Sequence, residues 1–140
     1  MRCEDPEATI IAAKLIELGC DFSEKKETSK RFLSKLEVPE EYILSVGTIE
    51  FRKNQNFLLK VYRQILLENK DFPSLVLAGK LGFGNNQIEH QVAYDPALKG
   101  KVKILNCLTD INLNSLYENC LFTVYPSLYE GWGLPISESL

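Results

Sequence analysis

The stretch YILSVGTIEFRKNQNFLL, residues 42–59, decides the fold, because it passes from one hydrophobic pattern to another. It opens with a continuous apolar run, residues 42–46, which is typical of a buried β-strand. After a polar turn, apolar residues recur through residues 56–69 at the spacing of one helix face. The residues that we expect on this face are Phe57, Val61 and Ile65, together with Leu58, Tyr62 and Leu66. The sequence therefore predicts a strand followed by an amphipathic helix.

The same alternation continues along the rest of the chain. Further strands are predicted at residues 74–79, 101–105 and 121–127, and further helices at residues 86–95, 112–120 and from Pro135 onward. Apolar strands that alternate with amphipathic helices indicate a parallel sheet covered on both faces. The predicted fold class is therefore α/β, with a parallel sheet and helices on both of its faces.

The first part of the chain shows weaker patterns. Residues 7–18 are compatible with a helix, and residues 23–40 are polar and charged, with a short helix expected at residues 27–36. We interpret residues 1–41 as a linker or partial helical segment and residues 42–140 as one domain. Because the chain stops just after the predicted helix start at Pro135, we expect the sequence to be a fragment of a longer protein.

The composition argues against several classes of function. The 140-residue chain carries a net charge of -3, so bulk attraction to nucleic acid is not indicated. No apolar run approaches the ~18 residues that a membrane-spanning helix requires. The four cysteines form no CxxC pair, and with one histidine in the chain no metal site is predicted. We expect these cysteines, Cys3, Cys20, Cys107 and Cys120, to be reduced and mostly buried.

Two cations stand out in the loop that follows the first strong strand. Ligands of open α/β sheets bind at the carboxyl ends of the strands, and this loop contains Arg52 and Lys53. Arginine offers a planar fork of donors and lysine a mobile point charge, which together suit a phosphate or diphosphate. The alternative is a surface pair at the start of a helix.

Two acids stand out at the end of the chain. Glu130 and Glu138 lie eight residues apart, across the glycine-rich turn EGWGLP. Because carboxylates would repel a diphosphate, we interpret them as acceptors for the hydroxyl groups of a sugar and a ribose. The alternative for Glu138 is a favourable acid in the first turn of a helix. Taken together, cations at one strand end and hydroxyl acceptors at another indicate a nucleotide sugar.

Three segments extend this interpretation: SVGTIEFRKNQNFLL, LVLAGK and LYENCLFTVYPSLYEGWGLPISES. They resemble the carboxyl-terminal, donor-binding half of retaining glycosyltransferases of the GT-B fold, family 4 type. The resemblance runs from about Tyr42 to Leu140 and implies a Rossmann-like donor-binding domain. The family's amino-terminal half and the elements after Glu138 are absent from this sequence, so we expect this chain alone to be inactive.

The resemblance implies roles for individual residues. Arg52 and Lys53 correspond to the pair that binds the donor diphosphate and supports the leaving group. Glu130 corresponds to the acid that contacts the transferred sugar, and Glu138 to the acid that holds the ribose. The other implied donor-binding residues are Gly47 beside the diphosphate, Asn106 and Cys107 along the base, and Gly131, Trp132 and Gly133 against the sugar.

The resemblance also implies a reaction and its partners. The expected reaction transfers a sugar from a UDP- or GDP-sugar to an acceptor, with retention at the anomeric carbon. No cofactor or metal is expected, because protein cations stabilise the diphosphate. The expected acceptor is a carbohydrate or lipid-linked molecule bound by the missing amino-terminal domain, and no nucleic acid is expected as a partner. The expected location is the cytoplasm, with peripheral association at the cytoplasmic face of a membrane as an alternative.

Two other hypotheses remain open on the sequence alone. One is a non-catalytic module that binds nucleotide sugars. The other is an unrelated doubly wound domain, such as a flavodoxin-like signalling module, in which Glu130 and Glu138 have only structural roles. The fold by itself does not distinguish between these hypotheses.

Overall fold

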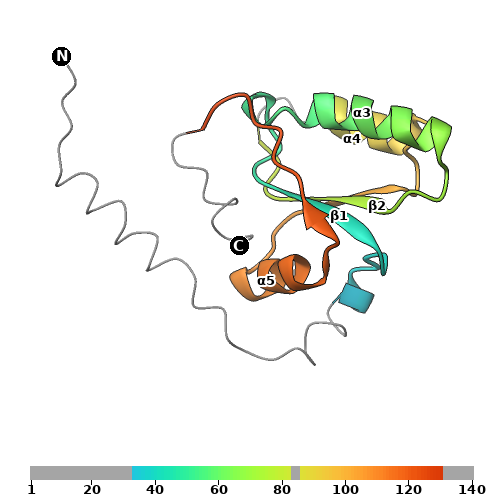
Figure 1. Cartoon of the computed structure of the whole chain (residues 1–140). Coiled ribbons are helices and arrows are strands. Elements are labelled where there is room, and N and C mark those ends of the chain that lie inside the picture. Colours follow the sequence, from blue (N-terminus) through green and yellow to red (C-terminus); the bar gives the residue numbers. More distant parts are fainter. Residues whose placement is uncertain (1–32, 83–85, 131–140) are drawn as a thin grey trace, which may run out of the picture.

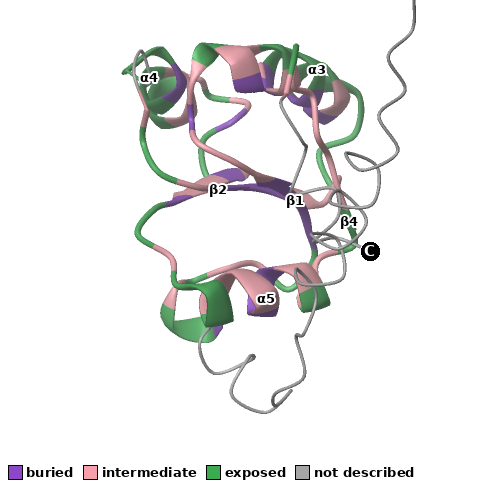
Figure 2. Cartoon of the chain, turned by 90° about the vertical axis from the view of Figure 1, so that its left-hand side faces the viewer, coloured by how far each residue is buried: buried purple, intermediate pink, exposed green. Residues whose placement is uncertain are grey.

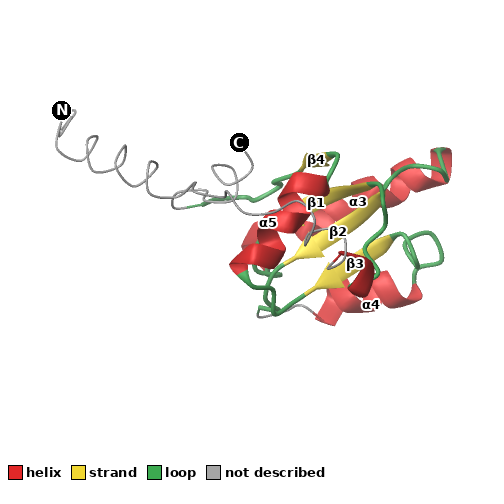
Figure 3. Cartoon of the chain, turned by 90° about the horizontal axis from the view of Figure 1, so that it is seen from below, coloured by secondary structure: helices red, strands yellow, loops and turns green. Residues whose placement is uncertain are grey.

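A computed structural model of the chain describes residues 33–82 and 86–130. These residues form a parallel sheet with the strand order β3-β2-β1-β4 (Figures 1 and 3). The strands are β1 (Tyr42–Val46), β2 (Ser74–Ala78), β3 (Val102–Leu105) and β4 (Phe122–Thr123). The helices are the short 3₁₀ helix η1 (Phe51–Lys53), α3 (Gln55–Glu68), α4 (Asn86–Tyr94) and α5 (Asp110–Asn119). Helices α3 and α4 cover one face and α5 the other, which confirms the predicted α/β, Rossmann-like class (Figure 2).

Strand β1 lies at the centre of the sheet, between β2 and β4. Tyr42 pairs with Ser74 in the parallel register of β1 with β2, and Ile43 pairs with Phe122 of β4. The first four residues of β1 are buried. Because helices cover both faces, neither side of the strand meets water, which is why its sequence is continuously apolar rather than alternating.

Buried side chains fill the space on both faces of the sheet. The cluster under α3 and α4 contains Ile43, Leu59, Tyr62, Leu66, Leu75, Leu77 and Ile88, among others. The cluster on the α5 face contains Tyr42, Leu44, Val76, Ala78, Leu105 and Leu116. The sheet is therefore a packed middle layer between two groups of helices.

Helix α3 buries only part of the predicted face. Tyr62 and Leu66 are buried as expected, and so is Leu59, which the predicted face omitted. Phe57 and Val61 were predicted to face the core, but they are 56% and 41% exposed. Two overlapping rows of apolar residues fit a helical spacing, and the row that contains Leu59 is the one that meets the sheet.

Strand β4 is shorter than predicted. Residues 121–127 were expected to be extended, but sheet pairing covers only Phe122–Thr123. The N–H of Val124 still donates to the Leu44 carbonyl at 2.8 Å. Pro126 then lacks the N–H that a continued ladder needs, and the chain turns away from the sheet.

Other element predictions have mixed outcomes. Helix α5 begins at Asp110, two residues earlier than predicted, because the Thr109 side chain caps it by accepting from the Asn112 N–H at 3.3 Å. Cys107 is exposed, so the expectation of mostly buried cysteines is wrong for this residue. The helix predicted at residues 7–18 and the one from Pro135 lie outside the described residues, as do Cys3 and Cys20. The boundary at residue 41 stays a prediction.

Within residues 33–82 and 86–130, no helix is both long and apolar enough to cross a membrane. The same part of the chain holds no group of three or more side chains suited to bind a metal ion.

Candidate functional site

The carboxyl ends of β1 and β4 meet where the direction of the strand order reverses. From β1 the chain builds outward through β2 to β3, and then returns to place β4 on the other side of β1. In open α/β sheets, ligands bind at such a switch point. The loop after β1 contains Arg52 and Lys53, and the loop after β4 contains Glu130. The fold thus brings together residues that are 77 and 78 positions apart in the sequence.

The turn after β1 directs Lys53 back over the sheet. Gly47, at the end of the strand, has a backbone φ of +146°, which residues with a side chain rarely adopt. A Cβ atom at Gly47 would lie 3.3 Å from Cε of Lys53, so the lysine stem packs directly against this glycine. Asn54, with φ 58°, then joins η1 to α3. Lys53 is left only 8% exposed, which argues against the surface-pair alternative.

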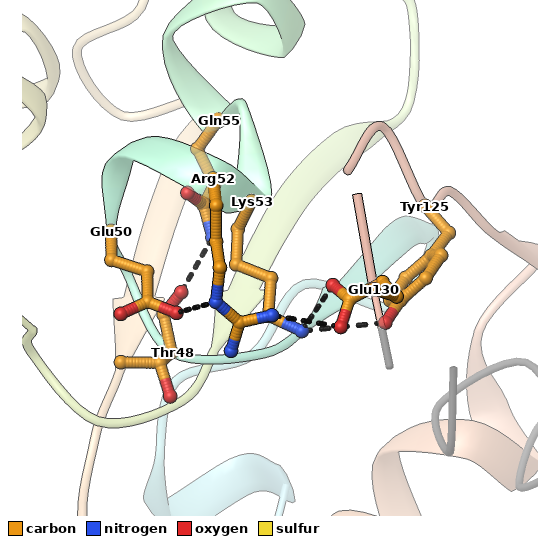
Figure 4. A network of polar contacts seen from close by, with 7 residues as sticks. All are labelled: Thr48, Glu50, Arg52, Lys53, Gln55, Tyr125 and Glu130. Carbon is orange, nitrogen blue, oxygen red and sulfur yellow. Dashed lines mark hydrogen bonds and ion pairs between the residues drawn. The ribbon is translucent and has the colours of Figure 1, made fainter. Parts of the chain in front are cut away.

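Glu130 forms ion pairs with both cations (Figure 4). Its Oε2 atom is 2.8 Å from Nη1 of Arg52, and its Oε1 atom is 2.6 Å from Nζ of Lys53. Arg52 also pairs through Nε with Oε1 of Glu50 at 2.7 Å. Lys53 Nζ donates to the Tyr125 hydroxyl at 3.3 Å and lies 5.3 Å from the centre of its ring. We call these five residues, Glu50, Arg52, Lys53, Tyr125 and Glu130, the charge cluster.

Further hydrogen bonds hold the two loops together. The N–H of Leu128 donates to the Arg52 carbonyl at 2.9 Å. The side-chain amide of Asn54 donates to the Pro126 carbonyl at 3.1 Å. The geometry of the charge cluster therefore rests on backbone contacts as well as ion pairs. Such preorganisation is what a site for a charged ligand requires.

Neighbouring side chains shift the pKa values of Glu130 and Arg52 so that both groups stay ionised. Burial raises the pKa of Glu130, but hydrogen bonds from Lys53, Ser127, Tyr125 and Arg52 outweigh it and lower this pKa to about 2. Desolvation lowers the pKa of Arg52, but its two carboxylate partners outweigh it and raise this pKa above the ordinary value. The carboxylate and the guanidinium are therefore both charged at neutral pH.

Residues at the start of the loop after β1 and within it line two cavities. One, of about 210 Å³, lies at the carboxyl edge of the sheet, and its walls include Gly47, Lys80 and Cys107. The other, of about 390 Å³, lies between the starts of α3 and α4 and is lined mainly by amide side chains and by Glu50. The smaller cavity thus contains two of the predicted donor-binding residues. The predicted Asn106 is exposed and precedes Cys107 in the chain.

The structure brings together three of the four residues on which the sequence interpretation rested, namely Arg52, Lys53 and Glu130. Glu138 lies outside the described residues, and so do the predicted turn residues Gly131, Trp132 and Gly133. The roles of all these residues remain predictions.

Sequence reasoning missed two members of the charge cluster. The sequence pattern assigns no site role to Tyr125, because no spacing motif distinguishes it from other aromatic residues. Glu50 lies two positions before Arg52, and an acid so close to an arginine is a signal that could have indicated the pair. The contact of Tyr125 with Lys53, in contrast, depends on the packing of the two loops, because these residues are 72 positions apart.

The fold and the charge cluster define a Rossmann-like domain with a polar site at a switch point of its sheet. The family described as "Glycosyl transferases group 1" matches residues 26–140, and the chain belongs to this family. The O-antigen chain mannosyltransferase B of Escherichia coli is 35% identical over 99 residues, which cover 71% of this chain and 26% of that protein. The serotype-specific mannosyltransferase WbdA of Escherichia coli is 34% identical over 123 residues, which cover 86% of this chain and 15% of that protein.

These comparisons support glycosyl transfer as the kind of reaction involved. They remove the hypothesis of an unrelated doubly wound domain. The chain spans about a quarter or less of the length of these relatives, so the activity of a whole protein is a matter for proposal.

Proposed function

We propose that this chain forms part of the donor-binding domain of a retaining glycosyltransferase of the GT-B fold, family 4 type. The protein that carries it would transfer a sugar from a nucleotide-diphosphate sugar to a carbohydrate or lipid-linked acceptor. The single observation that carries this proposal is the convergence of Arg52 and Lys53 with Glu130 at the switch point of the sheet. The proposed setting is the cytoplasm or the cytoplasmic face of a membrane.

The two cations suit the diphosphate of such a donor. Arg52 uses Nε and Nη1 for its two carboxylate partners and has further N–H donors to offer an anion. Lys53 is held by the Gly47 backbone, Tyr125 and Glu130, so little side-chain freedom remains to be lost when it binds. A fork and a point charge at neighbouring positions match the spread of charge over two phosphates.

The rest of the donor would extend to both sides of the cations. We assign the transferred sugar to Glu130, whose oxygens accept hydrogen bonds, and the nucleoside to the cavity of about 210 Å³ beside Gly47 and Cys107. On the family resemblance, Glu138 would hold the ribose, and Asn106 would lie along the base. The N–H groups near Gly131, Trp132 and Gly133 would meet the sugar hydroxyls.

The chemistry follows from the charge that develops on the leaving group. The bond between the anomeric carbon and the diphosphate oxygen breaks, and the electron pair moves to the phosphate. Arg52 and Lys53 would stabilise this charge without a metal ion or another cofactor. Preorganised donors at a developing anion typically lower the barrier by about 3 kcal/mol. The acceptor hydroxyl then attacks from the face that the diphosphate leaves and gives its proton to the departing diphosphate oxygen, so the configuration is retained.

The names of the relatives suggest the sugar. Both are mannosyltransferases, and on this basis we propose mannose as the transferred sugar and a carbohydrate chain as the acceptor. The base of the nucleotide is left to experiment, and a panel of UDP- and GDP-sugars with the intact protein identifies it.

Substitution of either cation tests the proposal. We expect Arg52→Ala or Lys53→Ala in the intact protein to lower turnover by roughly a hundredfold or more, because each removes a stabilising charge from the leaving group. Lys60→Ala is the matched control, since this exposed lysine on α3 carries the same charge away from the cluster. Near-normal turnover in both cluster variants would contradict the assignment. Donor binding without turnover in the wild-type protein would favour the non-catalytic module.

A further inference from the structure

We infer that Glu130 also acts as an internal counter-ion that makes the cation pair discriminate between an intact nucleotide sugar and a free nucleoside diphosphate. This inference rests on the proposed function and adds a second role to that of a hydroxyl acceptor. It would explain how a site with two adjacent cations avoids holding its own product, or any other diphosphate, too tightly.

Both carboxylate oxygens of Glu130 are engaged by the cations that a diphosphate would use. Oε2 pairs with Arg52 at 2.8 Å and Oε1 with Lys53 at 2.6 Å. The side chains of Glu130 and Lys53 are only 18% and 9% exposed, so water and salt screen this pairing weakly. An incoming phosphate therefore competes with Glu130 for the same donors.

The charge cluster has no net charge to attract a free diphosphate, so the competition between the diphosphate and Glu130 affects binding. Arg52 and Lys53 contribute two positive charges, and Glu50 and Glu130 contribute two negative charges, so the formal charges cancel. A free diphosphate brings negative charge and oxygen acceptors toward this neutral cluster. To bind Lys53 and Nη1 of Arg52 it must draw these donors away from Glu130 and leave a half-buried carboxylate without them, which is costly.

An intact donor differs from its product at this point. The sugar that is attached to the diphosphate carries hydroxyl groups, and these can donate hydrogen bonds to the oxygens of Glu130. The carboxylate then exchanges cationic donors for hydroxyl donors instead of losing them. The free diphosphate offers no such replacement, so Glu130 penalises the product more than the donor.

The test is Glu130→Gln in the intact protein, with binding measured by calorimetry. This substitution keeps the shape of the side chain and removes its charge. We expect inorganic pyrophosphate, UDP and GDP to bind roughly tenfold more tightly than to the wild type, because one repelling charge is gone. UDP- and GDP-sugars should show no such gain, because the amide replaces one of the two oxygens that would accept from the sugar hydroxyls with an NH₂ donor. The gain for pyrophosphate should shrink as salt is raised.

Two further variants separate this role from a change in folding or in overall charge. Glu68→Gln makes the same charge change at the other end of α3, where the side chain accepts from Gln64, and it should leave the affinities unchanged. Glu130→Asp keeps the charge and should keep most of the discrimination even if the shorter side chain weakens all binding.

The outcomes are distinct. An unchanged ratio of product to donor affinity in Glu130→Gln, or weaker binding of pyrophosphate, would overturn the counter-ion role while leaving the proposed function in place. Failure of the wild-type protein to bind any nucleotide sugar or diphosphate would overturn the proposed function, and the inference with it.

Discussion

At the scale of single residues, one glycine sets the position of the most buried cation. Gly47 ends β1 with a φ of +146°, and its missing side chain leaves room for the stem of Lys53. The ammonium group of Lys53 then reaches Glu130 and Tyr125 across the switch point. The position of the Lys53 ammonium group therefore depends on the absence of a side chain at Gly47.

Substitution of this glycine should destabilise the protein in two ways. Gly47→Ala would force a side chain into a strained conformation and also press its Cβ against Lys53, and we expect a loss on the order of 3 kcal/mol in the free energy of unfolding. Gly100→Ala is the matched control, because Gly100 also has a positive φ, of +79°, but nothing lies within 4 Å of its added Cβ. Its expected loss is about 1 kcal/mol. Equal losses in denaturant unfolding would show that contact with Lys53 is unimportant.

At the scale of elements, the side of α3 that packs on the sheet determines the orientation of η1, which precedes it and carries two residues of the site. The buried row of Leu59, Tyr62 and Leu66 fixes the rotation of the helix about its own axis. That rotation also fixes the direction in which η1, directly before α3, presents Arg52 and Lys53. The Tyr62 hydroxyl donates to the Pro73 carbonyl at 2.7 Å and adds a polar anchor to this apolar contact.

The buried row can be tested against Val61, which was predicted to face the core and is exposed instead. Leu59→Ala removes a fully buried side chain and should lower the free energy of unfolding by about 2–5 kcal/mol. Val61→Ala removes a side chain that is 41% exposed and should cost under about 1 kcal/mol. Denaturant unfolding of the two variants measures both values. A greater loss in Val61→Ala than in Leu59→Ala would contradict the orientation of α3.

At the scale of the whole molecule, the charge cluster joins the loops after β1 and β4. These loops belong to neighbouring strands, but nearly the full length of the described domain separates them along the chain. The two loops are connected by ion pairs from Glu130 to Arg52 and Lys53 and by the hydrogen bond from Leu128 to Arg52. Stability and ligand binding are therefore expected to depend on the same carboxylate.

This shared dependence predicts an effect of acid on stability. The pKa of Glu130 is lowered from 4.5 to about 2, so the folded state holds this carboxylate ionised where the unfolded chain would be protonated. Its contribution to stability is present above pH 4.5 and is lost as the pH falls toward 2. The difference in unfolding free energy between wild type and Glu130→Gln should shrink over this window. A difference that stays constant from neutral pH to pH 2 would show that the carboxylate is not stabilised by folding.

Most features that depend on residues close together in the sequence were predicted correctly. The pairing of side chains from distant segments was not. Strand β1 has the predicted bounds, because a buried strand carries a continuous apolar signal in its own residues. Strand β4 was predicted too long, because Pro126 has no N–H to continue the ladder, although the neighbouring β1 extends to Val46. Arg52, Lys53 and Glu130 could be named from residue type and position. Their mutual pairing could not, because the sequence interpretation assigned the cations to phosphate and the acid to hydroxyl groups.

The sequence by itself determined the α/β class, the order of strands and helices, and the residues with the charges that a diphosphate sugar would need. These features depend on local hydrophobic periodicity and on the chemistry of individual side chains. Only the tertiary structure decided which face of α3 is buried, how Gly47 makes room for Lys53, and that Glu130 binds both cations. Those features depend on contacts between segments far apart in the chain, and their geometry exists only after the sheet has brought the two loops together.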